Sequence, residues 1–219
     1  MTKTGSLAPF DGDVAEERFS ELFDRYKQHL AWVGVVIILA GVGVWFYLRS
    51  ESIKSQRAEA AYEAAVQSVS SGNIPLAQSD LKKAATRYAG TNGGSESSMA
   101  LAKIYYQQGK YQDGISALAG PAADKGDMQY EARLLVASGY EGLNRWAEAA
   151  KEYEAAADVA RFDADKASAR AMAARAYQAG GNKAAATKIW TDLLADPKST
   201  FATEAKIRLG ELDAAPIKT

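Results

Sequence analysis

Four turn-forming residues recur at nearly constant intervals along the sequence: Gly72, Gly109, Asn144 and Gly181, separated by 37, 35 and 37 residues. Seven residues before each lies an alanine, and four before each lies a serine or tyrosine. Five residues after each is a small residue, and nine after each is a large apolar one. In that order the sets are Ala65, Ala102, Ala137, Ala174; Ser68, Tyr105, Tyr140, Tyr177; Ala77, Gly114, Ala149, Ala186; and Leu81, Leu118, Tyr153, Trp190. Self-similarity at such a period indicates stacked supersecondary units.

Helix packing explains this repeated order of small and large residues. Where two antiparallel helices cross closely, the side chains at the crossing must be small, and large side chains fill the space beside it. We therefore predict an all-α fold in which residues 58–214 form an α-solenoid of about four helical hairpins, followed by a tail at 215–219. Residues 200–214, with Ala205, Leu209 and Leu212, are expected to form a terminal helix that covers the last hairpin.

The hairpins resemble the tetratricopeptide repeat. The segment Leu101-Ala102-x2-Tyr105 followed by Gly114-x3-Leu118 carries the likeness most clearly, and Val136-Ala137-x2-Tyr140 followed by Ala149-x3-Tyr153 repeats it. The opening Trp of that motif is absent, Ala replaces Gly at the crossing, and the period slightly exceeds 34 residues. The resemblance implies divergent repeats. The first repeat, which begins at about residue 58, matches the motif least well.

An uncharged apolar run occupies residues 30–48, LAWVGVVIILAGVGVWFYL. As a helix it would be about 28 Å long, close to the thickness of a bilayer core. Trp32 lies near one end, and Trp45 and Tyr47 near the other, where interfacial aromatic residues are common. A buried core helix is the alternative, but the run is apolar on every face. We predict one transmembrane helix, which Arg49-Ser50-Glu51 follows in place of a signal-peptide cleavage site.

The absence of Gly and Pro between Val44 and Ser71 predicts that this helix continues through residues 49–57 into the first hairpin. Within the run, Gly34 and Gly41 are two helical turns apart, with Ile37 or Ile38 between them. Such a small-residue face lets a neighbouring helix approach closely, so these four residues are candidates for contact with a membrane partner.

Residues 1–29 form a predicted head. Its first twelve residues are polar, and Asp13 with Glu16 resembles a helix N-cap and its reciprocal partner. Apolar residues then recur at helical spacing and are candidates for docking: Phe19, Leu22, Phe23 and Tyr26. This helix could lie along the membrane interface, which is favoured, continue into the span, or dock on a partner.

The composition excludes several classes of protein. Lys plus Arg number 26 against 27 Asp plus Glu, so the basic surface that nucleic-acid binding needs is not expected. No cysteine is present, and the single histidine, His29, lies at the membrane boundary, where an interfacial role is favoured over a ligand role. Catalysis needs converging titratable groups, and the carboxylates here are scattered over polar helix faces. We predict no enzyme activity, no cofactor, no metal and no small-molecule substrate.

Orientation is not determined by charge, because Arg18, Arg25 and Lys27 before the span balance Arg49, Lys54 and Arg57 after it. The layout as a whole resembles the ancillary Sec translocon subunits of bacteria, including the Tyr26-to-Leu30 approach to the span and the continuation from Gln56-Arg57-Ala58 to Tyr62. That resemblance implies the bacterial inner membrane, a cytoplasmic head and periplasmic repeats.

The first helix of each hairpin is expected to line a concave binding surface. The candidates on it are Tyr62, Val66, Met99, Lys103, Tyr106, Leu134, Glu141 and Arg175. Two functions remain open. The chain is either an accessory or scaffold subunit of an integral membrane complex, which could be translocon-like, respiratory or photosynthetic, or a tethered client-binding, chaperone-like module.

Overall fold

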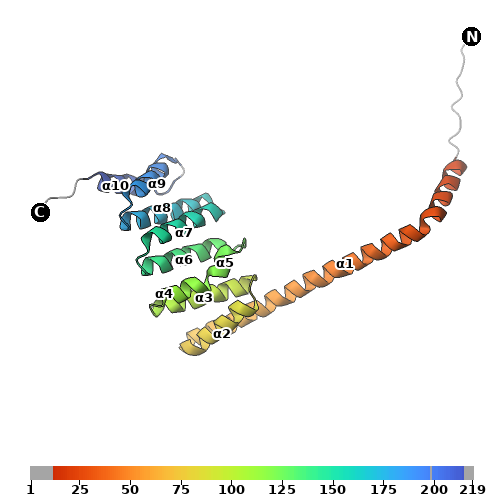
Figure 1. Ribbon diagram of the computed structural model, residues 1–219, viewed down its shortest axis with the longest axis horizontal. Helices are drawn as coiled ribbons and strands as arrows, with labels where there is room; N and C mark the ends of the chain where they lie inside the picture. The colour runs from red at the N-terminus through yellow and green to blue at the C-terminus, as the bar shows by residue number, and fades with distance from the viewer. Residues whose placement is uncertain (1–11, 198, 215–219) are drawn as a thin grey trace, which may run out of the picture. The chain divides into compact units, whose positions relative to one another are not determined.

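The computed structural model describes residues 12–197 and 199–214, with side chains from Trp32 onward. This described part contains ten α-helices and no strand, which confirms the all-α prediction (Figure 1). The helices are α1 (Gly12–Ser70), α2 (Ile74–Arg87), α3 (Asn92–Gln107), α4 (Tyr111–Ala117), α5 (Ala119–Ala123), α6 (Gln129–Gly142), α7 (Trp146–Val159), α8 (Asp163–Ala179), α9 (Lys183–Ala195) and α10 (Ala202–Asp213). The chain divides into two compact units, Met1–Ser52 and Ile53–Thr219.

Helix α1 contributes to both units. It continues without a break from Gly12 to Ser70, as the absence of Gly and Pro after Val44 predicts. Its last turns belong to the repeat unit, where Ala65 packs in one apolar cluster with Ala77 and Leu81 of α2. The end of α1 is therefore the first helix of the first hairpin.

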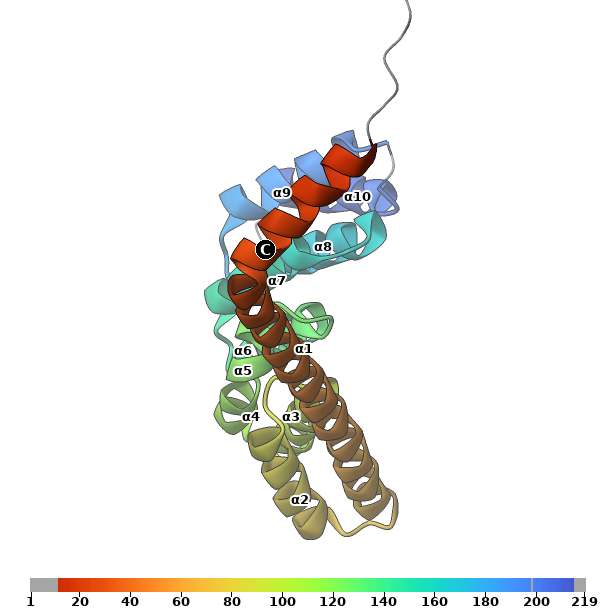
Figure 2. The same ribbon diagram turned by 90° about the vertical axis from the view of Figure 1, so that its right-hand side faces the viewer.

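The repeat unit is a stack of antiparallel helix pairs, and the two views show the pairs following one another in chain order (Figures 1 and 2). The end of α1 pairs with α2, α3 with α4, α6 with α7, and α8 with α9, while α10 packs against α9. The prediction of four hairpins and a terminal covering helix is confirmed. Asn73 and Asn182 cap α2 and α9, because their side chains accept hydrogen bonds from the amides of Leu76 and Ala185.

The four predicted turn residues all adopt the left-handed backbone conformation. Gly72, Gly109, Asn144 and Gly181 have φ values of 78°, 71°, 56° and 76°. At each turn the amide of the next residue donates to a carbonyl five residues back, as in Asn182 to Tyr177 at 2.8 Å. This is the Schellman arrangement, which satisfies carbonyls at a helix end and needs a residue that tolerates positive φ. The same turn geometry thus occurs in every hairpin.

Replacing Gly181 by Ala should lower the free energy of unfolding by about 1–2 kcal/mol, because a Cβ atom is strained at positive φ. Nothing lies within 4 Å of a Cβ atom built there, so the loss would come from the backbone alone. Urea denaturation of the full chain in detergent, followed by circular dichroism, measures it. Gly126→Ala is the matched control, because Gly126 has equally open surroundings and no positive φ. Equal stability of the two variants would contradict the argument.

The predicted order of small and large residues describes the core correctly. The alanines seven residues before the turns are fully buried, as are Leu81, Leu118 and Trp190. Tyr153, at the equivalent position of the third hairpin, is 6% exposed. Small residues at the crossings bring each helix pair close together, and the large residues fill the space beside them.

The second hairpin departs from the regular pattern. Its second helix is interrupted, since α4 ends at Ala117 and α5 begins at Ala119. Pro121 has no amide hydrogen to donate to the carbonyl of Ala117, so a regular helix cannot continue through this point. The Leu118 amide instead bonds to the Ile115 carbonyl, three residues back, at 3.1 Å. This interruption leaves only short helices beside α2 and α3.

Candidate interaction surfaces

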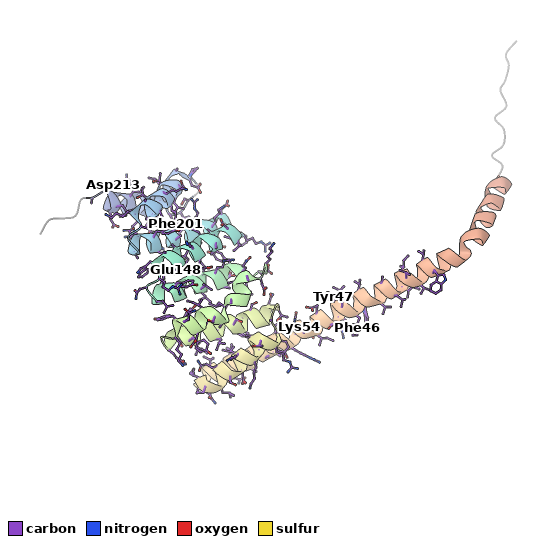
Figure 3. All side chains as sticks on the ribbon, viewed as in Figure 1. Phe46, Tyr47, Lys54, Glu148, Phe201 and Asp213 are labelled. Carbon is purple, nitrogen blue, oxygen red and sulfur yellow. The ribbon has the colours of Figure 1, made fainter. Side chains whose placement is uncertain are left out.

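The described part of the apolar run presents large side chains that are 45–71% exposed, from Trp32 at one end to Leu48 at the other. An 18-residue window of this helix has a mean hydropathy of 1.9, and none of it is buried. Figure 3 shows Phe46 and Tyr47 on this part of α1, before Lys54. Among the described residues, this is the one helix long and apolar enough to cross a membrane.

The candidate membrane-helix face consists of Gly34, Ile37, Ile38 and Gly41 on α1. Cβ atoms built at Gly34 and Gly41 meet nothing within 4 Å in the described part of the chain. Ile37 and Ile38 are 64% and 66% exposed. No contact within the described chain therefore requires glycine on this face. The predicted docking residues of the head, Phe19, Leu22, Phe23 and Tyr26, and also His29, lie outside the residues whose side chains are described.

Four of the predicted concave-surface residues pack between helices. Tyr62, Met99, Tyr106 and Leu134 are half-buried, and each lies against an apolar core cluster. The Tyr106 hydroxyl on α3 donates to the Leu135 carbonyl of α6 at 2.9 Å. Burial is also the main reason that the pKa of Tyr106 is raised. These side chains join neighbouring hairpins at least as much as they line a surface.

Val66 and Lys103 are the most open of the predicted set. Each directly follows the fully buried alanine of its hairpin, and each is exposed. Among the described residues, Lys103 has no ion pair or hydrogen bond through its side chain. An apolar side chain and a free ammonium group therefore occupy equivalent positions on the first two hairpins.

Glu141 and Arg175 are engaged by neighbours within the chain. Burial raises the pKa of Glu141, and a hydrogen bond with Tyr153 partly opposes that rise. Arg175 of α8 donates through Nε and Nη2 to the two carboxylate oxygens of Glu204 on α10, at 2.8 and 2.6 Å. Its guanidinium also lies 5.9 Å from the ring centre of Phe201, labelled in Figure 3. Arg175 thus links the terminal helix α10 to α8 of the last hairpin.

Replacing Glu204 by Gln should destabilise the attachment of α10 by about 1 kcal/mol at pH 7, the scale of a partly exposed ion pair. Hydrogen bonding from Arg175 lowers the pKa of Glu204 below its ordinary value of 4.5. The stabilisation is therefore complete above pH 4.5 and is lost as the pH falls through the lowered pKa. Urea denaturation at a series of pH values should show the difference from wild type shrinking in acid. A difference that does not depend on pH would contradict the ionic explanation.

A cleft of about 420 Å³ lies between α2, α3, α4 and α5 and was not predicted from the sequence. It opens where the second helix of the second hairpin is interrupted. The dipeptide Gly120-Pro121 was the available signal for it. No group of three or more His, Cys, Asp or Glu side chains that could hold a metal ion occurs among the residues described.

No protein-family model and no curated protein sequence matches the chain. Solved structures do resemble it. One is a crystal structure of the nearly identical TPR-like repeats of a Podosopora anserina protein described as a putative kinesin light chain, with 17% identity and a TM-score of 0.53 over 72% of this chain and 86% of that one. A single-substitution form of those repeats gives 17% identity and a TM-score of 0.54 over 73% and 87%. At this identity the likeness concerns the fold, which is a TPR-like α-helical repeat.

Proposed function

We propose that this chain is a non-catalytic, membrane-anchored accessory or scaffold subunit of an integral membrane protein complex. The apolar part of α1 attaches it within the bilayer, and the repeats contact exposed parts of its partners. The head lies in the cytoplasm and the repeats lie in the periplasm of a bacterial inner membrane. The observation that carries the proposal is the combination of one apolar helix, none of whose 18-residue apolar window is buried, with a TPR-like solenoid in the same chain.

The solenoid supports the role of a contact surface. Repeat proteins of this kind bury a continuous core between hairpins and leave an extended surface for protein partners. Here the core is built mainly from alanine, with few large side chains, and the surface carries charges of both signs. Such a surface is suited to contact with folded proteins. It is less suited to the specific binding of one charged peptide terminus.

The alternative is a tethered module that binds exported, unfolded clients. The exposed Val66, Leu76 and Phe162 favour it, because apolar side chains on a repeat surface can hold unfolded segments. Val66 and Leu76 lie in the first hairpin and Phe162 lies at the start of the fourth, and none of the three belongs to an apolar core cluster. The scaffold role therefore remains the main proposal.

Purification of the tagged full chain in mild detergent separates the two functions. An accessory subunit should co-purify with a fixed set of integral membrane subunits in constant ratio. A varied set of exported proteins in low and changing amounts would overturn the scaffold role and support client binding.

Replacing Gly34 and Gly41 by Leu should reduce this co-purification at least threefold, because two isobutyl groups would hold a neighbouring membrane helix away. The repeats should keep their unfolding transition. Gly43→Leu is the matched control, since Gly43 is two residues from Gly41 and so lies on a different face of α1. Equal recovery of partners with the double variant and the control would exclude this face as the attachment site.

A further inference from the structure

One position of the repeat is used differently in the four hairpins. It lies eleven residues before each turn and holds Ala61, Ser98, Arg133 and Arg170. In the third hairpin Arg133 pairs with Glu152 of α7 at 2.9 Å. In the fourth, Arg170 pairs with Asp192 of α9 at 2.8 Å. An arginine of the first helix thus reaches a carboxylate of the second helix in both hairpins.

The first hairpin has alanine at this position and still contains an ion pair beside it. Lys83 and Asp80 of α2 are 3.1 Å apart. Both line a small cleft of about 240 Å³ together with Ala61. Three of the four hairpins therefore place a cation and a carboxylate of their own at or beside this position.

The second hairpin lacks such a pair. Ser98 replaces the arginine, and the positions equivalent to Glu152 and Asp192 hold Ala117 and Gly120. All three of these residues line the cleft of about 420 Å³ between α2, α3, α4 and α5. We call this cleft the open slot. Three of its lining residues thus hold the register positions at which the two following hairpins place an arginine–carboxylate pair.

The wall of the open slot contains two serine hydroxyl groups. The residues Ser95 and Ser98 are 9% and 5% exposed, and both line the slot. Among the described residues, neither hydroxyl has a hydrogen-bond partner. Both hydroxyl oxygens are accessible through the open slot, so they are available to hydrogen-bond with an occupant.

The charge of the open slot indicates the sign of that occupant. Asp113 and Asp124 line it, against the single cation Lys82. Within the described part of the chain, none of these three side chains forms an ion pair. The balance is therefore negative, and a cation with several donors would complement both the carboxylates and the hydroxyls. Guanidinium presents five N–H donors in a plane and suits this arrangement better than a single ammonium group.

We propose that the open slot binds an arginine side chain from a partner polypeptide, beside the register position at which later hairpins hold an arginine of their own. This inference rests on the proposed protein-binding role of the repeats and adds a specific contact to it. A volume of about 420 Å³ is in the range of ligand-binding pockets and can admit a side chain with flanking backbone.

The test is a titration of the full chain in detergent micelles with the blocked tripeptide acetyl-Ala-Arg-Ala-amide, followed by the amide NMR signals of the repeat unit. The expected result is saturable shifts at Ser95, Ser98 and Gly120 with a dissociation constant in the millimolar range. The same peptide with citrulline in place of arginine keeps the shape and removes the charge, and it should bind at least tenfold more weakly.

Variants locate the interaction. Asp113→Asn with Asp124→Asn should weaken binding about tenfold, and Lys82→Gln should strengthen it about threefold. Asp127→Asn is the matched control, because Asp127 is exposed and does not line the slot, and it should leave binding unchanged. Circular dichroism checks that each variant is folded.

Equal binding of the arginine and citrulline peptides would overturn the proposal, as would no saturable shift, or binding that is indifferent to both Asp113→Asn/Asp124→Asn and Lys82→Gln. The titration needs no membrane partner. A failed titration would therefore overturn the arginine site and leave the scaffold proposal intact. A failed co-purification would overturn the scaffold proposal, and the titration would still report on the open slot.

Discussion

Replacing Ile38 and Val42 together by Arg should release the chain from membranes. Both side chains lie near the middle of the apolar run and are 66% and 57% exposed on α1. An arginine at the centre of a membrane helix costs about 2.5–3.5 kcal/mol on insertion scales, so two should cost about 5–7 kcal/mol. We expect this cost to exceed the favourable free energy with which the apolar run inserts into the bilayer. After alkaline extraction, the wild type should remain in the pellet and the double variant should appear in the supernatant.

The control adds the same two charges to the repeat unit. Leu76→Arg with Leu194→Arg changes side chains that are 46% and 42% exposed on α2 and α9. This control variant should stay in the pellet. If the wild type itself were released by alkaline extraction, or if both double variants behaved alike, the apolar run would not be the anchor.

Replacing Trp190 by Ala should cost about 3–5 kcal/mol of stability, the largest effect expected in the repeat unit. Trp190 is fully buried in the core cluster that contains Ala174, Ala186 and Ala205, so its truncation leaves a large cavity in the core. Because solenoid hairpins depend on their neighbours, the loss should concentrate in α8, α9 and α10. Hydrogen exchange should rise in these three helices and stay unchanged in α2 and α3.

Trp190→Phe is the informative companion variant. Among the described residues, the indole N–H of Trp190 has no hydrogen-bond partner, and it is buried. Leaving such a donor unpaired costs about 1–3 kcal/mol, which phenylalanine would recover while filling most of the space. The Phe variant should therefore lose less than half of what the Ala variant loses. Equal losses would contradict this argument, because neither filling most of the cavity nor removing the unpaired donor would then have stabilised the variant.

The regular features of the fold were predictable because each depends on a local property of one residue. A backbone position with positive φ strongly favours glycine over other residues. The spacing of Gly72, Gly109 and Gly181 therefore reveals the turns directly. Close helix crossings demand small side chains, so Ala102 and Ala137 identify the crossings. Asn144 fits the same series because asparagine tolerates the left-handed conformation better than other side chains do.

The surfaces were less predictable because exposure depends on the neighbouring hairpin. Tyr106 and Leu134 lie at positions expected on the concave side, yet the small residues around them bring the next helix close enough to cover them partly. Arg175 meets Glu204 only because α10 folds back on the last hairpin, a contact across 29 residues. The open slot depends on the small side chains at Ser98, Ala117 and Gly120, and the sequence marks it only through the Gly120-Pro121 dipeptide.

The size of the detergent-extracted particle that contains this chain tests most directly whether it is a subunit of a membrane complex. A membrane extract in mild detergent can be separated by native electrophoresis and probed for the tagged full chain. An accessory subunit should appear in one discrete species far larger than the 23.4 kDa chain, with the same integral membrane subunits in constant ratio across preparations. A species that contains the chain alone in its micelle, or a broad smear without constant composition, would contradict it.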